Sequence, residues 1–311
     1  MKNKVLIGSL IATLFSFMLY SASLKRVQNS TIRVIGPKTS STLKTNKKQL
    51  PKVKEPKVNS VEYTNHVKVD KGSQQDLTKQ IKQVMGTSAS YQVSVQNLNK
   101  SSKYARVANS SKVHGVDDTM KLFLLAAIYH QEQKGKLTSK TAIKVKKSDR
   151  VKGEKMLKTG MAYGIAYLKR AMMRGDKTAA NALLRRVKPS KVNSVAQKLG
   201  ATDTAISQNF TSPAGKTSAD DLAKAMTGIY QGKGLNRQYA AMVLNSLRLV
   251  KTKPKLVQGI SGGVYAIGDN NSAAAIVQGK SYSYCMTVWS NRNDKFAKLG
   301  KTIDTWQKKH H

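Results

Sequence analysis

Apolar side chains recur at helical spacing at both ends of the region 73–311. In its first segment, Leu77, Ile81 and Val84 fall on one face of a helix that Gly86 would end. The residues that would cap the start of this helix as a capping box are Ser73 and Asp76. The last segment of the chain repeats the pattern, with apolar positions at Phe296, Leu299, Ile303 and Trp306. We therefore predict a helix at each end of this region.

Alternation with a period of two predicts strands between these helices. Tyr91, Val93 and Val95 alternate with polar residues, and the Asn-Lys-Ser-Ser turn at 99–102 returns the chain as a β-hairpin. Strand-like segments return late in the chain, at 262–269, 272–279 and 281–290. The sheet is therefore expected to draw its strands from both ends of the region.

The chain between these two groups of strands is typical of helices. An apolar run after Asp117 and Asp118 predicts a buried helix over about 116–131, and residues 161–250 carry further amphipathic segments. Because a helical block separates strands of one sheet, the fold class is α+β rather than alternating βαβ. We expect two lobes: an antiparallel sheet flanked by the terminal helices, and an inserted all-helical lobe over roughly 120–250.

The first 72 residues differ in composition from the rest. Residues 1–24 combine a basic start, an apolar stretch and small residues, a pattern that fits a signal peptide or an uncleaved membrane anchor. Residues 25–72 are rich in Lys, Ser, Thr and Asn, and contain Pro37, Pro51 and Pro56, so we predict a basic, disordered linker. The folded domain would then cover 73–311, exported to the cell surface or secreted.

The chain is strongly basic. Its 55 Lys and Arg residues against 16 Asp and Glu give a formal net charge of +39 at pH 7. This excess predicts an anionic partner. Export makes nucleic acid a poor candidate, so we expect anionic cell-wall polymers or the membrane surface, with peptidoglycan as a further possible ligand.

The sequence offers no metal or cofactor chemistry. Cys285 is the only cysteine, so it forms no internal disulfide, and its apolar surroundings favour a buried core position. The histidines show no paired metal-ligand spacing; they are His66, His114, His130, His310 and His311. We predict no metal and no cofactor.

Several segments together resemble a known enzyme family. The segments 174–184, 198–204 and 216–226, the first of which begins Arg-Gly-Asp-Lys, are similar, in order and spacing, to the penicillin-recognising serine hydrolases, closest to class A β-lactamases. The resemblance covers about 73–311 and implies that family's two-lobed fold. It also implies three motifs around one cleft: Ser-x-x-Lys, Ser-Asp-Asn and Lys-Thr/Ser-Gly.

The matching positions lack most of the family's reactive groups. By the resemblance, Asp118 stands where the serine nucleophile would be, while Lys121 retains the lysine. Thr119 carries a hydroxyl, but it lies about 100° around the helix from Asp118. The second motif is replaced by Gly175, Asp176 and Lys177, so its serine and asparagine are absent.

The third motif also departs from the family's pattern. We match it to Ile260, Ser261 and Gly262, which keep the hydroxyl and the glycine and lose the cation. The segment 203–218, where the class A family has its deacylating glutamate, contains no Glu. The Ser41-x-x-Lys44 sequence in the predicted linker is a chance match in a stretch rich in these residues.

Three functions remain open from the sequence. The first is a catalytically inactive β-lactamase-like domain that binds the anionic envelope, in which Asp118 caps a helix and pairs with Lys121. The second is an active serine hydrolase with a rearranged site that acts on β-lactams or peptidoglycan peptides. The third is a polyanion-binding surface protein that uses the fold only as a platform. As the matching positions do in the family, Asp118, Lys121, Asp176 and Ser261 are expected to face one cleft.

Overall fold

The computed structural model describes residues 66–310. The predicted signal or anchor at 1–24, and the predicted linker as far as residue 65, lie outside the described residues. Among residues 66–310, no helix combines the length and the hydropathy that crossing a bilayer requires.

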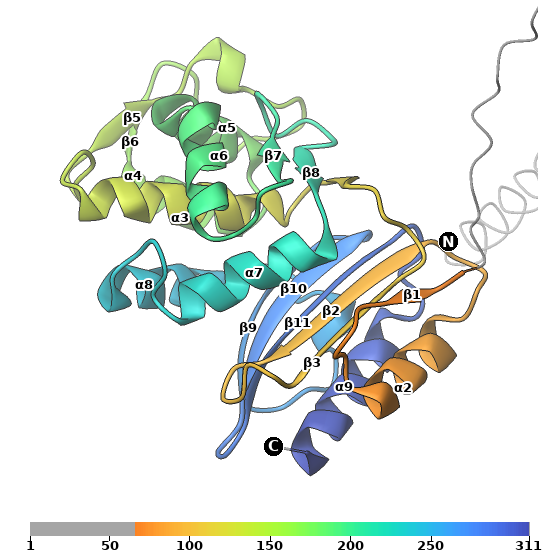
Figure 1. The fold of residues 1–311 in the computed structure, drawn as a ribbon. Coiled ribbons are helices and arrows are strands. Elements are labelled where there is room, and N and C mark those ends of the chain that lie inside the picture. The colour runs from red at the N-terminus through yellow and green to blue at the C-terminus, as the bar shows by residue number, and fades with distance from the viewer. Residues whose placement is uncertain (1–65, 311) are drawn as a thin grey trace, which may run out of the picture. The chain divides into compact units, whose positions relative to one another are not determined.

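A six-stranded antiparallel sheet forms one lobe, with the strand order β1-β3-β2-β11-β10-β9 (Figure 1). Its strands are β1 (Lys68–Val69), β2 (Tyr91–Asn97), β3 (Tyr104–Ala108), β9 (Gly263–Gly268), β10 (Ser272–Gln278) and β11 (Ser283–Ser290). The N-terminal hairpin joins the C-terminal strands through the pair β2–β11, in which Val93 lies opposite Val288. The α+β fold class and the sheet drawn from both ends of the chain are therefore confirmed.

Both faces of this sheet are buried. Along β11, Tyr284, Met286 and Val288 belong to one core cluster, while Cys285 and Trp289 belong to the other. Because successive side chains point to opposite faces, a strand covered on both faces is apolar at nearly every position. This explains why residues 284–289 are apolar at every position except Thr287.

The two terminal helices cover one face of the sheet. Helix α2 (Gln75–Met85) and helix α9 (Phe296–Lys309) lie side by side there (Figure 1). Their apolar faces are buried as predicted; the side chains are Leu77, Ile81, Val84, Phe296, Leu299, Ile303 and Trp306. Burying a side chain of this size stabilises the fold by about 1.5–3 kcal/mol.

The second lobe is built around α3 (Met120–Gln133), which is apolar on every side and has residues 120–129 buried. A helix of this kind is stable only inside a core. The helices of the lobe and of its junction with the sheet are α4 (Ile165–Met173), α5 (Lys177–Val187), α6 (Pro189–Lys198), α7 (Ala219–Tyr230) and α8 (Arg237–Leu247).

This lobe is not all-helical, which corrects the sequence expectation for 120–250. Its short strands are β4 (His114–Val116), β5 (Ala142–Lys144), β6 (Ala162–Gly164), β7 (Ala205–Ile206) and β8 (Gly215–Thr217). They form a three-stranded sheet β4-β8-β7 and a two-stranded sheet β5-β6. Two or three residues are too few to produce a recognisable alternation.

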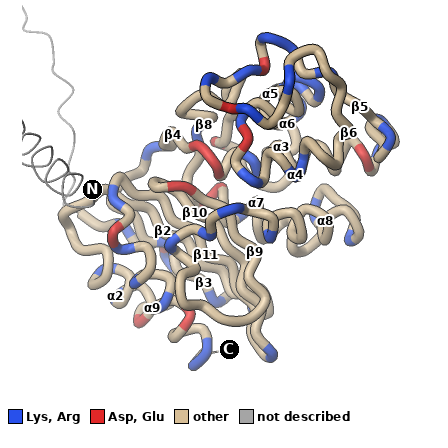
Figure 2. The backbone as a smooth tube through the Cα atoms, turned by 180° about the vertical axis from the view of Figure 1, so that it is seen from behind, with Lys and Arg blue, Asp and Glu red and all other residues tan. Residues whose placement is uncertain are grey.

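Lys and Arg positions outnumber Asp and Glu positions in both lobes (Figure 2).

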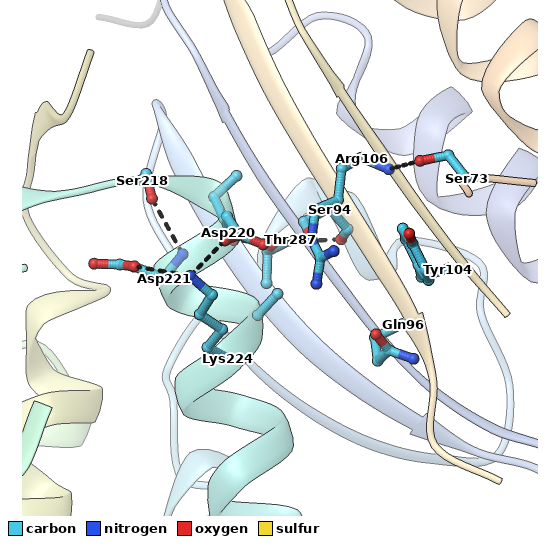
Figure 3. Close-up of polar contacts among 12 residues, drawn as sticks. Ser73, Ser94, Gln96, Tyr104, Arg106, Ser218, Asp220, Asp221, Lys224 and Thr287 are labelled. Atoms are coloured by element: carbon cyan, nitrogen blue, oxygen red, sulfur yellow. Dashed lines mark hydrogen bonds and ion pairs between the residues drawn. The ribbon is translucent and has the colours of Figure 1, made fainter. Parts of the chain in front are cut away.

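Helix α7 joins the two lobes through polar contacts with the sheet (Figure 3). The Asp220 carboxylate accepts from Arg106 Nε of β3 at 2.5 Å and from Lys224 Nζ at 2.8 Å. Thr287 Oγ1 of β11 donates to the Ala219 carbonyl at 2.6 Å. Burial raises the pKa of the Asp221 carboxyl, which accepts from the Thr204 hydroxyl. These bonds fix the angle at which the helix meets the sheet.

The start of the domain differs from the prediction in two ways. Strand β1, at Lys68–Val69, pairs with β3, so the fold begins before the predicted boundary at Ser73. The expected capping box is also absent, because Ser73 Oγ accepts the N–H of Arg106 instead of a helical N–H. The predicted end of this helix is confirmed: Gly86 follows α2 with φ 66°.

Candidate functional site

A cavity of about 400 Å³ lies where the start of α3, the turn after α4 and the end of β9 meet. Asp118 lines it from the turn that leads into α3, Lys121 from the first turn of that helix, and Gly175 from the turn between α4 and α5. Residues 250–255 close another side. The structure therefore brings together the first two of the three segments singled out in the sequence.

Asp118 and Lys121 form an ion pair in this cavity. The Asp118 carboxylate lies 2.7 Å from Lys121 Nζ, as the sequence predicted. The Lys121 side chain is 3% exposed, whereas the Asp118 side chain is 37% exposed. An ammonium group so far from water is costly unless a carboxylate accompanies it. Asp118 thus neutralises the lysine from the solvent side.

Asp118 does not cap the helix, which corrects that part of its predicted role. Thr119 occupies the N-cap position of α3, and no side chain caps this helix end. The Thr119 side chain is buried, and its hydroxyl lies 3.0 Å from the Ser272 hydroxyl of β10. Thr119 therefore faces the sheet and offers no hydroxyl to a ligand in the cavity.

Asp269, at the end of β9, is a site residue that the sequence analysis missed. Its Oδ2 accepts the backbone N–H groups of Asp117 at 3.1 Å and of Asp118 at 2.9 Å. Its Oδ1 accepts those of Asn271 and Ser272, each at 2.8 Å. An aspartate followed by two asparagines is a turn signal, but no local pattern indicates that it also holds the start of α3.

This arrangement bears directly on acyl transfer. Acyl transfer needs backbone N–H groups aimed at the oxygen that becomes negatively charged in the transition state. The N–H of Asp118, the residue that the resemblance matches to the nucleophile position, instead donates to the Asp269 carboxylate. A carboxylate already lies at this end of β9, so a substrate oxyanion there would meet a like charge.

The second segment divides between the cavity and a helix cap. Gly175 lines the cavity with φ 106°, a backbone conformation that glycine adopts without strain. Asp176 turns inward, where its Oδ1 accepts the Ala179 N–H at 2.7 Å and caps α5. Lys177 follows as the first residue of this helix. Asp176 is thus not among the residues that line the cavity.

A second carboxyl group that the sequence analysis missed lies beside Asp176. Glu154 Oε1 accepts the Lys177 N–H at 2.9 Å. Burial, and then the neighbouring Asp176 carboxyl, raise the pKa of Glu154. The pair therefore holds the start of α5, and its carboxyl groups face each other rather than a ligand.

The match of the third motif to Ile260, Ser261 and Gly262 was wrong. These residues lie before the start of β9, whereas Ile267, Gly268 and Asp269, at its other end, line the cavity. The length of the strand therefore separates the predicted motif from the cavity by roughly 20 Å. Gly262 lines a separate hollow with Arg248 and Val264. The Ser-Gly sequence matched the motif locally, but the lengths of the strand and of the turn before it decide which residues reach the cavity. Ser261 therefore does not face the cleft with Asp118 and Lys121.

The free charges around the cavity are mainly positive. Its lining includes Arg174, Lys251, Lys253 and Lys255. The Asp118 carboxylate already has a cation, and Asp269 already accepts several N–H groups. The cavity therefore favours an anionic group over a cationic one.

Cysteine chemistry, a metal site and the family's deacylating glutamate were all predicted to be absent. Cys285 is buried, and burial raises the pKa of its thiol to about 12, so the thiol is protonated at neutral pH. Within residues 66–310, no group of three or more His, Cys, Asp and Glu side chains is arranged to hold a metal ion. The segment 203–218 forms β7, β8 and a loop tied to Asp117 by Ser212 Oγ at 2.8 Å.

The sequence pattern of the Beta-lactamase enzyme family matches residues 76–306. The chain belongs to the β-lactamase enzyme family. Among curated proteins, none matches this chain in sequence. The family match spans both lobes, including the cavity.

Solved structures show the same fold. A structure of PBP-A is 20% identical with a TM-score of 0.68, over 76% of this chain and 97% of that one. The TLA-3 extended-spectrum β-lactamase is 17% identical with a TM-score of 0.66, over 74% and 98%. A β-lactamase from Sphaerobacter thermophilus DSM 20745 is 16% identical with a TM-score of 0.63, over 74% and 94%. At these identities the likeness concerns the fold.

Proposed function

We propose that this chain is a non-hydrolytic member of the β-lactamase enzyme family that binds anionic groups of the cell envelope. The observation that carries the proposal is the state of Asp118, at the nucleophile position. Its carboxylate is paired with Lys121, and its backbone N–H is bonded to Asp269. The position thus lacks both the hydroxyl for attack and a free donor for the oxyanion.

The chemistry of a carboxylate supports the same conclusion. Attack by Asp118 on a carbonyl would give a mixed anhydride, which is far less stable than the ester formed by a serine. A serine nucleophile also needs a neighbouring base to take its proton. In this cleft Lys121 Nζ is paired with the Asp118 carboxylate instead of facing a serine hydroxyl, and Gly175 has no side chain that could carry a proton.

Charge supports the binding role. The chain carries a formal net charge of +39, and the cleft is lined by four Lys and Arg side chains besides Lys121. An exported basic protein meets wall phosphate polymers, acidic lipid head groups and the carboxylates of peptidoglycan. Export itself belongs to this proposal and rests on the sequence of residues 1–24.

The test is intact-mass analysis of the purified chain after incubation with penicillin G. A structure of a PBP-A variant that matches this chain is described as an acyl-enzyme complex with that compound, so PBP-A is a suitable positive control. We expect no adduct on the wild-type chain. A stoichiometric adduct would overturn the proposal and favour an active serine hydrolase.

The variant Asp118→Ser tests whether the nucleophile alone is missing. We expect no adduct on this variant either, because Gly175 still supplies no proton route and Asp269 still accepts the N–H of residue 118. Groups that act as one catalytic unit do not restore activity singly. An adduct on Asp118→Ser would show that the rest of the site is competent.

A further inference from the structure

A second cavity, of about 520 Å³, lies at the opposite end of α3 from the cleft. It is formed by the last turn of α3, the residues that join α5 to α6, and one face of α6. Ala127, Val187 and Val195 give it an apolar floor. Its size falls in the range of small-molecule binding sites, about 300–1,000 Å³.

Every Lys, Arg, Asp or Glu residue that lines this cavity is a Lys or an Arg. Its charged residues come from three separate segments and are Lys134, Lys136, Arg186, Lys188, Lys191 and Lys198. All six are exposed, and none makes an ion pair with an acidic residue of the described region. Nearby acids are already paired: Glu132 holds Lys169, and Asp149 holds Arg185, each through a contact of 2.7–2.8 Å. The positive charge here is therefore uncompensated.

Lys188 stands at a backbone position that favours glycine. Its φ is 79°, and it is the one non-glycine residue of the described region with a positive φ. A residue with a Cβ is strained in this conformation, and such strain persists only where the surroundings impose it. Here a glycine would be easier to accommodate, but it would not bring a charge to the rim.

His130 lies half-buried between the floor and the rim. Burial, and then the ammonium groups of Lys198, Lys134 and Lys136, lower the pKa of its imidazole. The neighbouring charges on the segment that follows α3 and on α6 thus disfavour a proton at this position. An anion seated among them would reverse this effect and raise the pKa. The imidazole is therefore a built-in reporter of anion binding.

We propose that this cavity binds the phosphate groups of an anionic phosphodiester polymer. The Arg186 guanidinium can bind two phosphate oxygens at once, and the lysines supply point charges for neighbouring phosphates along the chain. The concave shape holds phosphates that project from a flexible polymer better than it holds a flat surface. This inference specifies phosphodiester polymers as the ligand class for the envelope binding proposed above. It therefore rests on that proposal.

The test follows the His130 ring resonances of the full-length chain by NMR, assigned with His130→Gln. We expect a saturable shift on titration with tripolyphosphate, and a raised imidazole pKa at saturation. A soluble poly(glycerol phosphate) is expected to give the same shift. No shift with either probe at low salt overturns the site.

A charge-removal variant and a matched control make the test specific. The pocket variant combines Arg186→Gln, Lys188→Gly and Lys191→Gln. The control removes the same number of exposed charges from the helices of the sheet lobe, by Lys79→Gln, Lys298→Gln and Lys301→Gln. We expect the pocket variant to bind tripolyphosphate at least tenfold more weakly than the wild type, and the control to bind within about twofold of it.

Stability separates binding from folding in this test. Because Lys188→Gly relieves a left-handed residue, the pocket variant is expected to unfold at no lower temperature than the control. Equal affinities of the pocket variant and the control overturn the site. A pocket variant that unfolds earlier contradicts the interpretation of Lys188, and Lys191→Gln with Lys198→Gln then tests the cavity without touching that backbone.

The outcomes also separate this site from the broader proposal. If poly(glycerol phosphate) binds the wild type and the pocket variant equally while His130 does not respond, the site is wrong and envelope binding through other charges stands. If the polymer does not bind the wild-type chain at all, both fail. If phosphatidylglycerol vesicles move the His130 resonances and the polymer does not, the phosphate source is a lipid surface and the polymer assignment is overturned.

Discussion

The Asp118 carboxylate balances an ammonium group, that of Lys121, which is almost entirely out of water. The resemblance matches the same aspartate to the family's serine nucleophile, and an aspartate has no hydroxyl to offer a ligand in the cleft. Asp269 has a similar double effect, because it fixes the β9–β10 turn and occupies the N–H of residue 118. The two aspartates therefore hold the start of α3 and the β9–β10 turn together in the cleft.

Removing the Asp118 charge should therefore destabilise the domain. Asp118→Asn leaves the buried Lys121 without its counter-ion, and breaking a fully buried pair costs about 3–5 kcal/mol. Since about a third of the Asp118 side chain is exposed, we expect a smaller loss, about 1–3 kcal/mol, in urea unfolding. Adding Lys121→Met should recover most of it. An unchanged unfolding midpoint for Asp118→Asn would contradict the role assigned to this pair.

His114 should make the domain less stable in mild acid. Its ring stacks on Trp289, and burial together with Lys112 lowers the pKa of the imidazole from 6.5 to about 4. The unfolded chain then takes up a proton first, so the stability contributed by the neutral ring is complete above pH 6.5 and is lost as the pH falls toward 4.

The variant His114→Phe tests this dependence, because it keeps a ring against Trp289 and cannot titrate. The free energy of unfolding in urea, measured from neutral pH down toward the folded-state pKa, should fall less steeply for the variant than for the wild type. Parallel curves for the two proteins would show that His114 does not contribute to acid sensitivity.

Among the elements, α9 shows how packing reverses a local preference. Gly300 lies within this helix, where alanine is favoured over glycine by about 1 kcal/mol. A Cβ at this position, however, would collide with the carbonyl oxygen of Leu256, in the short helical turn Lys255–Val257. The glycine lets the helix approach that turn closely.

Gly300→Ala should therefore destabilise the domain, by about 1–3 kcal/mol as overpacking typically does. The control is Lys301→Ala on the exposed face of the same helix, which we expect to stay within about 0.5 kcal/mol of the wild type. Thermal or urea unfolding measures both. A stabilised Gly300→Ala variant would show that the helix and the turn can separate without cost.

Elements with long periodic patterns were predicted well. The terminal helices, the hairpin and the three C-terminal strands formed where the sequence placed them, because their apolar faces were long enough to specify one buried side. The short strands β4 to β8 and the pairing of β1 were missed, because such strands exist only through their partners. The cap at Ser73 failed for a similar reason: its hydroxyl is engaged by the neighbouring strand β3.

For the whole molecule, the net charge of +39 leads to a prediction about salt. Attraction between exposed charges is screened beyond about 10 Å at 0.1 M salt. Binding of the full-length chain to poly(glycerol phosphate) should therefore weaken by about tenfold or more between low and physiological salt. Sedimentation or surface binding at several salt concentrations measures this. Affinity independent of salt would exclude electrostatic recruitment.

The sequence by itself determined the α+β class, the order of the elements, the family resemblance and the aspartate at residue 118, which the resemblance matches to the family's serine. These properties depend on local periodicity and on residue identity, which a chain carries without folding. It also predicted the Asp118–Lys121 pair, because residues three apart are neighbours in a helical turn; in the structure Asp118 lies in the turn that leads into α3.

Only the tertiary structure decided which residues share the cleft. It put Asp269 where Ser261 was expected, turned Asp176 into a helix cap beside Glu154, and gathered six cations from three segments around His130. Each of these depends on contacts between residues far apart in sequence, whose registers are set by strand lengths, turns and close packing. Local pattern does not encode such distances; the closed fold does.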